Sequence, residues 1–570
     1  MVSANNSFRP GSVLLLAIIL LPRPSHAQTS DADTIVIDYA AARKAAHSYR
    51  LPATRVLSID YAARKSPLSP FWAYFGYDEP NYTYMKDGKK LLSEIAALSP
   101  VPVYVRCHNL LTTGDGTPAL KWGSTNAYTE DAQGHPVYNW HIIDSIFDTY
   151  IQRGMKPLAE IGFMPEALST HPQPYRHHWK PGSRYDTIYT GWAYPPNDYK
   201  KWGELVYQWV RHSIQRYGKK EVSTWLWEVW NEPNIGYWKG TPEEYFKLYD
   251  YAADAVKRAL PSARVGGPAT TGPGGNRAAV WLKDFLAHCS DSINAVTGKK
   301  GSPLDFISFH AKGSPRVVNG HVRMNMSPQL KDAANGFEIV AHSAYKDLPI
   351  YVTECDPEGC AACGMTTNPE NAYRNGTMYS SYTAASFARI YDLAQRSKIR
   401  LGGLISWSFE FEDQKWFDGF RDLATNGVDK PVLNVFRMYG LMKGNRIPVE
   451  DSSTLACADT HSLSVMCWNY WEDDVPGVAD TVKIAFAGLP AGKKIIIRRY
   501  TIDRQHSNAY EVWKRMGSPQ SVTAGQYRQL EQSGQLQQEG DPIFLEVTRG
   551  EAAYTLVLPA SAVSLVQLTY

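Results

Sequence analysis

The sequence predicts an α/β protein, a (β/α)8 barrel followed by a smaller C-terminal β-sandwich. Eight short apolar runs alternate with amphipathic helical stretches between about residues 70 and 444, and polar side chains follow the ends of those runs. From residue 445 the helical stretches give way to short runs separated by turns, which predicts the second domain over 445–570. A chain of 570 residues suffices for one large core and a smaller one.

The barrel prediction depends on the order of its elements. The predicted strands cover residues 71–76, 101–106, 157–162, 224–230, 264–268, 305–309, 350–354 and 403–408. The predicted helices include 140–153, 199–217, 242–260 and 370–395. The third helix has a full start signal, with Thr241 as N-cap, Pro242 in the first turn and Glu244 completing a capping box. A doubly wound sheet would also alternate strands and helices, but no glycine-rich dinucleotide fingerprint follows an early strand.

The C-terminal runs predict an antiparallel sandwich. They cover residues 462–468, 481–487, 494–500, 543–547 and 553–558. The segment before the barrel, 28–69, is extended in character over 33–61 and could add strands to that sandwich.

The N-terminus predicts export. Arg9 precedes an apolar run over 13–22, and Ser25 and Ala27 place small residues at the −3 and −1 positions of a cleavage site. Residues 1–27 are therefore expected to be a signal peptide cut after Ala27. The run is too short to span a bilayer and no longer one follows. We expect a secreted or periplasmic protein, without a membrane anchor after cleavage.

Charge and composition narrow the partners. The net charge is +3 and 20% of residues are charged, so neither nucleic acid nor an anionic membrane is an evident partner. The chain has 17 Trp and 35 Tyr, and aromatic planes pack well on the apolar faces of sugar rings. A saccharide is the partner that this composition suits; it does not predict an oligomeric state.

Seven cysteines in an exported chain predict at least one disulfide. Cys457 and Cys467 flank a short predicted hairpin, and we expect them to pair. Cys355, Cys360 and Cys363 crowd one loop, where a pair is expected without its identity being readable. A zinc site there would need four ligands, and no spaced histidine pair accompanies the three thiols.

Function in a barrel of this kind belongs at the C-terminal ends of the strands. Those ends carry several polar side chains, namely Arg106, His108, Asn109, Glu160, Asn231, Glu232, His310, Lys312, Glu354, Trp407 and Glu410.

Glu232 and Glu354 stand out as a pair. Each ends an apolar strand, the fourth and the seventh, where a buried carboxylate is costly unless it has a task. Glycoside hydrolysis needs two carboxyl groups, one protonated donor and one ionised partner. Their separation distinguishes retention from inversion, and the sequence does not give it. These two carboxyl groups can carry out every proton transfer that the reaction needs, so no metal or organic cofactor is expected.

Several motifs in order resemble glycoside hydrolase family 39, which holds β-xylosidases and α-L-iduronidases. The motifs are 104–108, 156–165, 228–234, 265–268 and the strand-end Glu354, with a late segment over 503–519. The resemblance spans about residues 70–570. It implies a retaining double displacement, with Glu232 as acid/base and Glu354 as nucleophile.

The resemblance also implies substrate-binding roles. Asn231 matches the residue that hydrogen-bonds the sugar 2-hydroxyl, and Trp407 matches an apolar wall under the sugar. His108 and His310 match residues that line the sugar subsite. Each histidine could instead be a satisfied structural residue, and Trp407 could be a core residue.

The identity of the sugar is less determined. Lys312 stands where xylosidases often carry an aromatic and where the iduronidase branch has a Lys facing the substrate carboxylate. Arg421, on the loop beyond the eighth strand, could be a second cation, and Glu410 is a further candidate for substrate binding. Lys312 could equally be a solvated loop residue or a partner of Glu410 or Glu412.

The late segment favours the xylosidases, so β-D-xylosidase acting on xylo-oligosaccharides is the first expectation. A uronidase and an arabinose-type pentosidase remain alternatives. A non-catalytic carbohydrate-binding protein is the alternative of another class, although two ionisable groups at strand ends argue against it.

Overall fold

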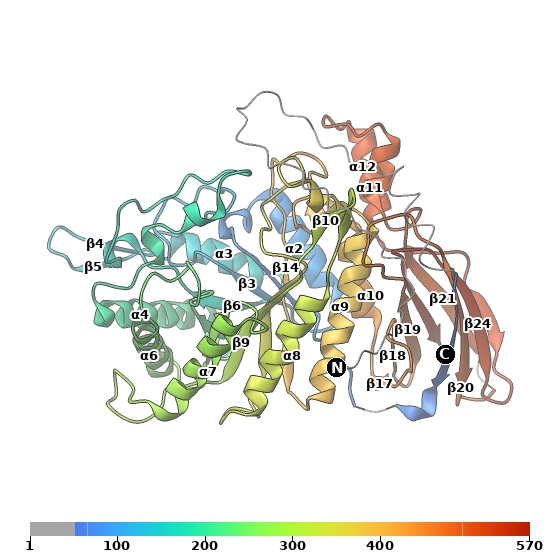
Figure 1. Ribbon diagram of the computed structural model, residues 1–570, viewed down its shortest axis with the longest axis horizontal. Coiled ribbons are helices and arrows are strands. Elements are labelled where there is room, and N and C mark those ends of the chain that lie inside the picture. The colour runs from blue at the N-terminus through green and yellow to red at the C-terminus, as the bar shows by residue number, and fades with distance from the viewer. Residues whose placement is uncertain (1–51, 65, 493) are drawn as a thin grey trace, which may run out of the picture. The chain divides into compact units, whose positions relative to one another are not determined.

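The computed structural model describes residues 52–64, 66–492 and 494–570, and the predicted barrel is confirmed. Its parallel sheet is ordered β13-β12-β9-β8-β7-β6-β3-β2-β14 (Figure 1). The strands are β2 (Tyr74–Tyr77), β3 (Tyr104–Cys107), β6 (Lys156–Ile161), β7 (Leu226–Val229), β8 (Arg264–Thr270), β9 (Phe306–Lys312), β12 (Ile350–Asp356), β13 (Leu401–Leu404) and β14 (Ser406–Trp407).

The barrel closes through its last strand. β13 pairs with β12, and β14, one residue later, pairs with β2. Ile405 between them donates its N–H to Val352 at 2.9 Å and accepts from Cys355 at 2.8 Å. β13 and β14 are thus two halves of one eighth strand, which returns the sheet to its first strand.

Helices cover the outside of the barrel. They are α2 (Lys86–Leu98), α3 (His141–Ile151), α4 (Tyr199–Tyr217), α6 (Pro242–Ala259), α7 (Asn276–Asp291), α8 (Ser327–Ala341), α9 (Thr377–Arg396) and α10 (Pro431–Leu441). Most bury one face, whereas α9 and α10 are buried around most of their surface. The capping box predicted before α6 is present, with Thr241 and Glu244 each bonding the other's backbone. The helix predicted over 370–395 is broken, because Gly376 is extended between a 3-10 turn (Pro369–Asn375) and α9.

The C-terminal strands form two sheets. One is ordered β1 (Thr54–Asp60), β20 (Asp480–Ala487), β24 (Ala552–Leu558). The other joins β17 (Asn445–Ile447), β18 (Thr454–Ala458), β19 (Ser462–Trp468), β25 (Val563–Thr569), β21 (Lys494–Ile502) and β22 (Gln537–Gln538), with β23 (Ile543–Glu546) also on β21. Leu57, Ile484 and Leu568 are among the apolar side chains buried together between them.

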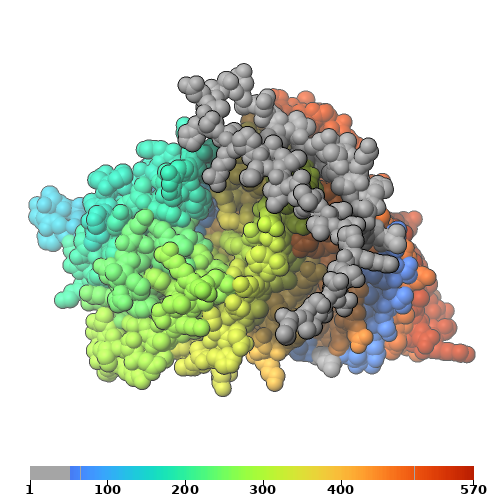
Figure 2. All heavy atoms as spheres, in the orientation of Figure 1, coloured from blue at the N-terminus to red at the C-terminus, as the bar shows by residue number. Residues whose placement is uncertain are grey.

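β1 runs parallel to β20 along its whole length, from Thr54 opposite Thr481 to Asp60 opposite Ala487. Figure 2 accordingly shows the blue atoms of the first described residues among the orange and red atoms of the C-terminal strands. The remainder of the segment predicted to be extended, and the predicted signal peptide, lie outside the described residues.

Two helices interrupt the C-terminal strands and were not predicted. α11 (Ala509–Arg515) and α12 (Ala524–Gly534) lie between β21 and β22. The side chain of Trp513, in α11, is buried against Phe417, which belongs to a loop of the barrel. Both helices are short, so apolar periodicity is weak there; the capping box at Thr523 is the signal that was available.

The predicted Cys457–Cys467 disulfide is wrong. In the register of β18 and β19, Cys457 stands opposite Ser464 and Cys467 opposite Thr454, so the two thiols are three rungs apart. An odd offset also turns them to opposite faces of the sheet. Both are free and buried, and the disulfide among the described residues joins Cys360 to Cys363.

Across the described part of the chain, none of the helices is long and apolar enough to cross a membrane.

Candidate active site

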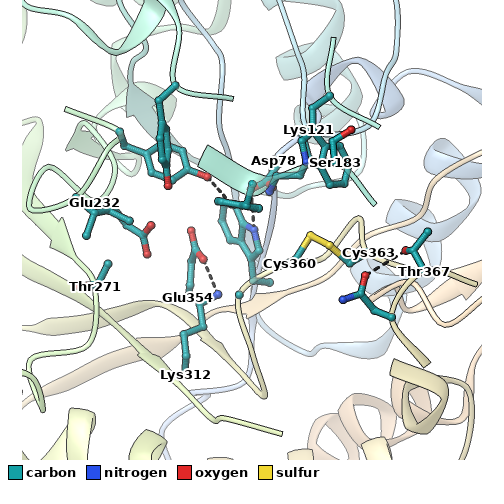
Figure 3. Close-up of a pocket in the computed structure, with 18 of the residues that line it drawn as sticks. Asp78, Lys121, Ser183, Glu232, Thr271, Lys312, Glu354, Cys360, Cys363 and Thr367 are labelled. Carbon is teal, nitrogen blue, oxygen red and sulfur yellow. Dashed lines mark hydrogen bonds and ion pairs between the residues drawn. A yellow bond between two sulfur atoms is a disulfide. The ribbon is translucent and has the colours of Figure 1, made fainter. Parts of the chain in front are cut away.

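A cavity of about 760 Å³ opens at the C-terminal ends of the barrel strands (Figure 3). Glu232, Glu354, Lys312 and Trp407 line it, as predicted from their places at strand ends. The other lining residues are Asp78, Lys121, Trp179, Gly182, Ser183, Tyr185, Tyr189, Ile235, Tyr237, Thr271, Gly272, Gly359, Cys360, Cys363, Thr367 and Asn368.

The two predicted catalytic carboxylates meet in this cavity, and Figure 3 shows them turned toward each other. One oxygen of Glu232, one of Glu354 and one ring nitrogen of His310 lie within 4.8 Å of one another. Nδ1 of His310 is 2.9 Å from Oε1 of Glu232 and 3.8 Å from Oε2 of Glu354. The imidazole therefore hydrogen-bonds Glu232 and lies within ion-pair distance of Glu354.

Irregular backbone places Glu232 at the mouth of the barrel. Trp230 and Glu232, directly after β7, have positive φ angles of 71° and 44°. The register of β8 shifts at Ala269, also at positive φ, and its carbonyl accepts the N–H of Glu232 at 2.8 Å. Strain of this kind concentrates at functional sites, where surrounding contacts hold it in place.

Glu354 likewise follows an irregularity. The register of β12 against β9 shifts between Val352 and Glu354, so that Glu354 pairs with His310. A bulge in a strand re-aims the side chain that follows it. Here it directs Glu354 into the cavity, with only 5% of the residue exposed.

Arg106 is the centre of a buried cluster with Glu160, Glu228 and Glu354, which we call the floor of the cavity. Its guanidinium lies 2.5 Å from Glu228, 2.9 Å from Glu160 and 3.3 Å from Glu354. It also donates to the amide oxygen of Asn231 at 3.0 Å. The predicted Asn231 is thus held beside the nucleophile candidate, although it does not itself line the cavity.

His108 connects the floor to the first strand. Its Nε2 lies 3.4 Å from Glu354 and 3.2 Å from Glu160, and its Nδ1 lies 3.1 Å from Asp78. Burial alone would lower the pKa of His108, but Glu160, Asp78 and Glu354 raise it to about 9. His108 is therefore one of the groups that lower the pKa of Glu354.

Trp407, in β14, forms part of the wall of the cavity. Its indole N–H donates to Asp78 at 2.9 Å, and its ring centroid lies 4.4 Å from that of His108. The wall depends on Gly76, because a Cβ there would approach the indole ring to 2.4 Å. Only glycine lets the ring lie this close to β2.

Lys312 bonds the nucleophile candidate directly. Its ammonium lies 2.6 Å from Oε2 of Glu354 and 2.9 Å from Oδ1 of Asp356, rather than near Glu410 or Glu412. Burial alone would raise the pKa of Glu354, but His310, Lys312 and His108 outweigh it and hold that pKa well below its usual range. Glu354 is therefore the ionised carboxylate of the site.

Of the predicted substrate-binding residues, Lys312 and Trp407 line the cavity, whereas Asn231, His108, His310, Glu410 and Arg421 are not among the lining residues. The last two are bonded to other partners. Arg421 is fully buried, donates to the carbonyl of Trp407 at 2.8 Å and pairs with Asp356 at 2.7 Å. Glu410 is buried and accepts the N–H of Gly427 at 2.5 Å. Neither side chain is among those that line the cavity.

Several lining residues were not predicted. Asp78 directly follows β2, so the strand-end rule would have identified it. Lys121 forms an ion pair with Asp78 from the loop after β3. Tyr185 and Tyr237 share a hydrogen bond of 2.8 Å between two other loops. Long loops have no periodicity, and the sequence offers no signal that brings these residues together.

Glu232, His310 and Glu354 also have the donor types of a metal site. Against this, Lys312 and Arg106 already bring two positive charges to Glu354, and His310 occupies Glu232. The set fits a proton-transferring pair better than a bound cation. That no cofactor is needed stays a prediction.

Known proteins resemble this chain over nearly its whole length. The sequence model of glycosyl hydrolases family 39 matches residues 55–543, which confirms the resemblance seen in the motifs. A β-xylosidase of Caldicellulosiruptor saccharolyticus is 29% identical over 530 residues, covering 89% of this chain and 97% of that protein. An α-L-iduronidase of Mus musculus is 24% identical over 523 residues, covering 83% and 75%. The crystal structure of a monomeric β-xylosidase from Caulobacter crescentus CB15 superposes with a TM-score of 0.73 at 26% identity, covering 90% and 99%.

Proposed function

Because the chain belongs to glycosyl hydrolases family 39, we propose that it is a retaining glycosidase that releases terminal sugars, with Glu354 as nucleophile and Glu232 as acid/base. One observation carries the proposal: donor oxygens of the two carboxylates lie within 4.8 Å of each other. Carboxyl groups of retaining enzymes are about 5–5.5 Å apart, and those of inverting enzymes about 6.5–9.5 Å. The shorter spacing leaves no room for a water between carboxylate and sugar.

The reaction has two steps. Glu354 attacks the anomeric carbon, the bond from that carbon to the leaving oxygen breaks, and the oxygen takes the proton of Glu232. Glu354 is then a neutral ester and Glu232 a carboxylate. In the second step Glu232 takes a proton from water, the water oxygen attacks the anomeric carbon, and Glu354 leaves as a carboxylate. Asn231 and His108 are not among the residues that line the cavity; they would orient Arg106 and Glu354, and Trp407 would support the sugar ring.

We propose β-D-xylosidase activity on xylo-oligosaccharides as the specific function. Both basic side chains among the described cavity-lining residues are already neutralised, Lys121 by Asp78 and Lys312 by Glu354 and Asp356. A substrate carboxylate would have to displace one of these internal partners, whereas a neutral pentose would not. The β-xylosidase of Caldicellulosiruptor saccharolyticus supports the same choice.

A uronidase is the second candidate. Lys312 lines the cavity and its side chain is 17% exposed, so a substrate carboxylate could reach it if Asp356 released it. The α-L-iduronidase of Mus musculus supports this alternative. Arg421, however, is fully buried and offers no second cation.

A panel of p-nitrophenyl glycosides tests the substrate. We expect the β-D-xyloside to be cleaved with the highest kcat/KM, ahead of the α-L-arabinoside, the β-D-glucuronide and an α-L-iduronide. A strong preference for a uronide that disappears in Lys312→Ala would establish the uronidase instead. If the wild type cleaves none of them while it still binds xylo-oligosaccharides, the chain is a carbohydrate-binding protein.

Azide rescue tests the assignment of the nucleophile. We expect Glu354→Gly to be nearly inactive and to regain activity with sodium azide, giving a glycosyl azide of inverted anomeric configuration, because azide enters the space of the missing carboxylate. Rescue that appears in Glu232→Gly with the same inverted product, and not at Glu354, would reverse the two roles.

We also propose that the mature protein is exported and begins after Ala27, on the strength of the N-terminal sequence pattern. N-terminal sequencing of the protein purified from its native host tests this. A mature chain that retains residues 1–27 would contradict it.

A further inference from the structure

Lys312 is shared between two carboxylates of one strand. Its ammonium lies 2.6 Å from Oε2 of Glu354, and 2.9 Å and 3.1 Å from the two oxygens of Asp356. Glu354 and Asp356 are two positions apart on β12, so both side chains leave the same face of the strand. Lys312 is registered beside Asp356 on the neighbouring strand β9.

The proposed first step changes the charge on one of these carboxylates. When Glu354 becomes an ester it loses its negative charge, and Glu232 gains one by giving up its proton. The new charge lies on Glu232, which is 2.9 Å from Nδ1 of His310. Among the described residues, the ion-pair partners of Lys312 are Glu354 and Asp356, and Glu232 is not one of them. The ammonium would therefore lose its shorter ion pair at the moment the glycosyl-enzyme forms.

A buried cation without a counter-charge is costly. The Lys312 side chain is only 17% exposed, so water cannot fully replace Glu354. Asp356 is 3% exposed and is itself held by the guanidinium of Arg421 at 2.7 Å. Arg421 is anchored in turn to the carbonyl of Trp407. Asp356 thus stays in place whether or not Glu354 carries a charge.

We propose that Asp356 is a positioning residue that serves as the standing counter-ion of Lys312 and so stabilises the glycosyl-enzyme, in which Glu354 is neutral. The proposal rests on the proposed role of Glu354 as nucleophile. Asp356 is not among the residues that line the cavity; it acts through Lys312.

The titration of Asp356 agrees with this role. Burial raises the pKa of Asp356 to about 7 against the pull of Arg421 and Lys312, and the charge of Glu354 adds to the rise. Esterification removes that last contribution. Asp356 is therefore more completely ionised in the glycosyl-enzyme, when Lys312 depends on it alone.

The test separates the two chemical steps in Asp356→Asn. It uses the dinitrophenyl and nitrophenyl forms of the glycoside that the wild type cleaves best. We expect kcat/KM, which reports formation of the glycosyl-enzyme, to fall about 30-fold or more, as when one partner of a buried charge pair is removed. The fall should be larger for the nitrophenyl substrate. We expect kcat for the dinitrophenyl substrate, limited by hydrolysis of the intermediate, to change little, because that step restores the charge of Glu354.

A double variant supplies the decisive comparison. In Lys312→Met/Asp356→Asn there is no ammonium to neutralise. Replacing Asp356 in the Lys312→Met background should therefore lower kcat/KM far less than it does in the wild-type background. Asp429→Asn is the matched control: it removes a buried aspartate that pairs with Arg437 at 2.7 Å outside the cavity. Asp429→Asn should lower the unfolding midpoint without changing the ratio of kcat/KM to kcat for the dinitrophenyl substrate.

Three results would overturn the proposal. They are equal slowing of both steps in Asp356→Asn, no slowing of either step, or a fall in kcat/KM on replacing Asp356 that is the same in the wild-type and Lys312→Met backgrounds. Each result presupposes that the wild type is active and that azide restores activity to Glu354→Gly. If that condition fails, the proposed function is refuted and the role of Asp356 falls with it.

Discussion

Replacing Lys312 by methionine should shift the acid side of the pH–activity profile. The ammonium lies 2.6 Å from Oε2 of Glu354 and is one of three groups that hold the pKa of this carboxylate below its usual range. Methionine keeps most of the side-chain length and removes the charge. The proton that inactivates the nucleophile should then bind at higher pH, so activity should be lost earlier as the pH falls.

The geometry bounds the size of the shift. Two unit charges 2.6 Å apart interact by about 6 kcal/mol at an effective dielectric constant of about 20, equivalent to between 4 and 5 pH units. That is a ceiling, because Asp356 shares the ammonium at 2.9 Å and His310 and His108 remain. A neighbouring opposite charge typically moves a carboxyl pKa by about 1–3 units. We expect the acid limb to rise by that amount.

The assay is kcat/KM for an aryl xyloside from acid to neutral pH at constant ionic strength, since this ratio reports groups of the free enzyme. Lys312→Arg is the matched control, because it keeps the charge and should move the acid limb much less than Lys312→Met. An acid limb in Lys312→Met at or below that of the wild type would refute the electrostatic reasoning. Equal shifts in both variants would attribute the effect to packing.

Three further predictions concern the floor and rim of the cavity. Arg106→Met should lower the free energy of unfolding by about 3–5 kcal/mol in chemical denaturation, because it leaves buried carboxylates uncompensated; a midpoint like that of the wild type would contradict the network. Trp407→Phe should cost about 1–3 kcal/mol of stability and raise KM, since Asp78 loses an indole donor, and an unchanged KM would mean that the ring is no part of the sugar site. Cys360→Ser/Cys363→Ser should cost no more than about 2 kcal/mol, because the loop it closes is short, yet raise KM, because the disulfide lines the cavity. Thermal unfolding and KM under oxidising conditions check this last prediction, and a large loss of stability with normal KM would invert it.

Strand-end reasoning found much of the candidate site. Glu232, Glu354, Lys312 and Trp407 line one cavity because parallel strands deliver their C-terminal residues to the same end of a barrel. The same rule would have included Asp78, which follows β2 but was not singled out. Apolar alternation followed by a polar residue is a local signal, and local signals are what a sequence displays directly.

The rule could not tell which side of a strand each residue faces once the backbone becomes irregular. Glu410 and Arg421 follow the eighth strand, yet both are buried outside the cavity lining. Cys457 and Cys467 flank a hairpin, yet their register keeps them apart. A shift of one residue reverses the facing of a side chain, and hydrogen-bond register is set by partners distant in the sequence.

The sequence by itself determined the barrel, the second β domain, the family and the two carboxylates, because hydrophobic period, turn residues and strand-end chemistry are properties of neighbouring residues. Only the tertiary structure decided that the carboxylate oxygens approach within 4.8 Å with His310 hydrogen-bonded to Glu232. It likewise decided that the ammonium of Lys312 forms ion pairs with Glu354 and Asp356 and is not left unpaired for a substrate carboxylate. Distances and ion pairs of this kind depend on two strand bulges, on loops far apart in the chain and on burial that strengthens every charge interaction, and none of these is a property of a short segment.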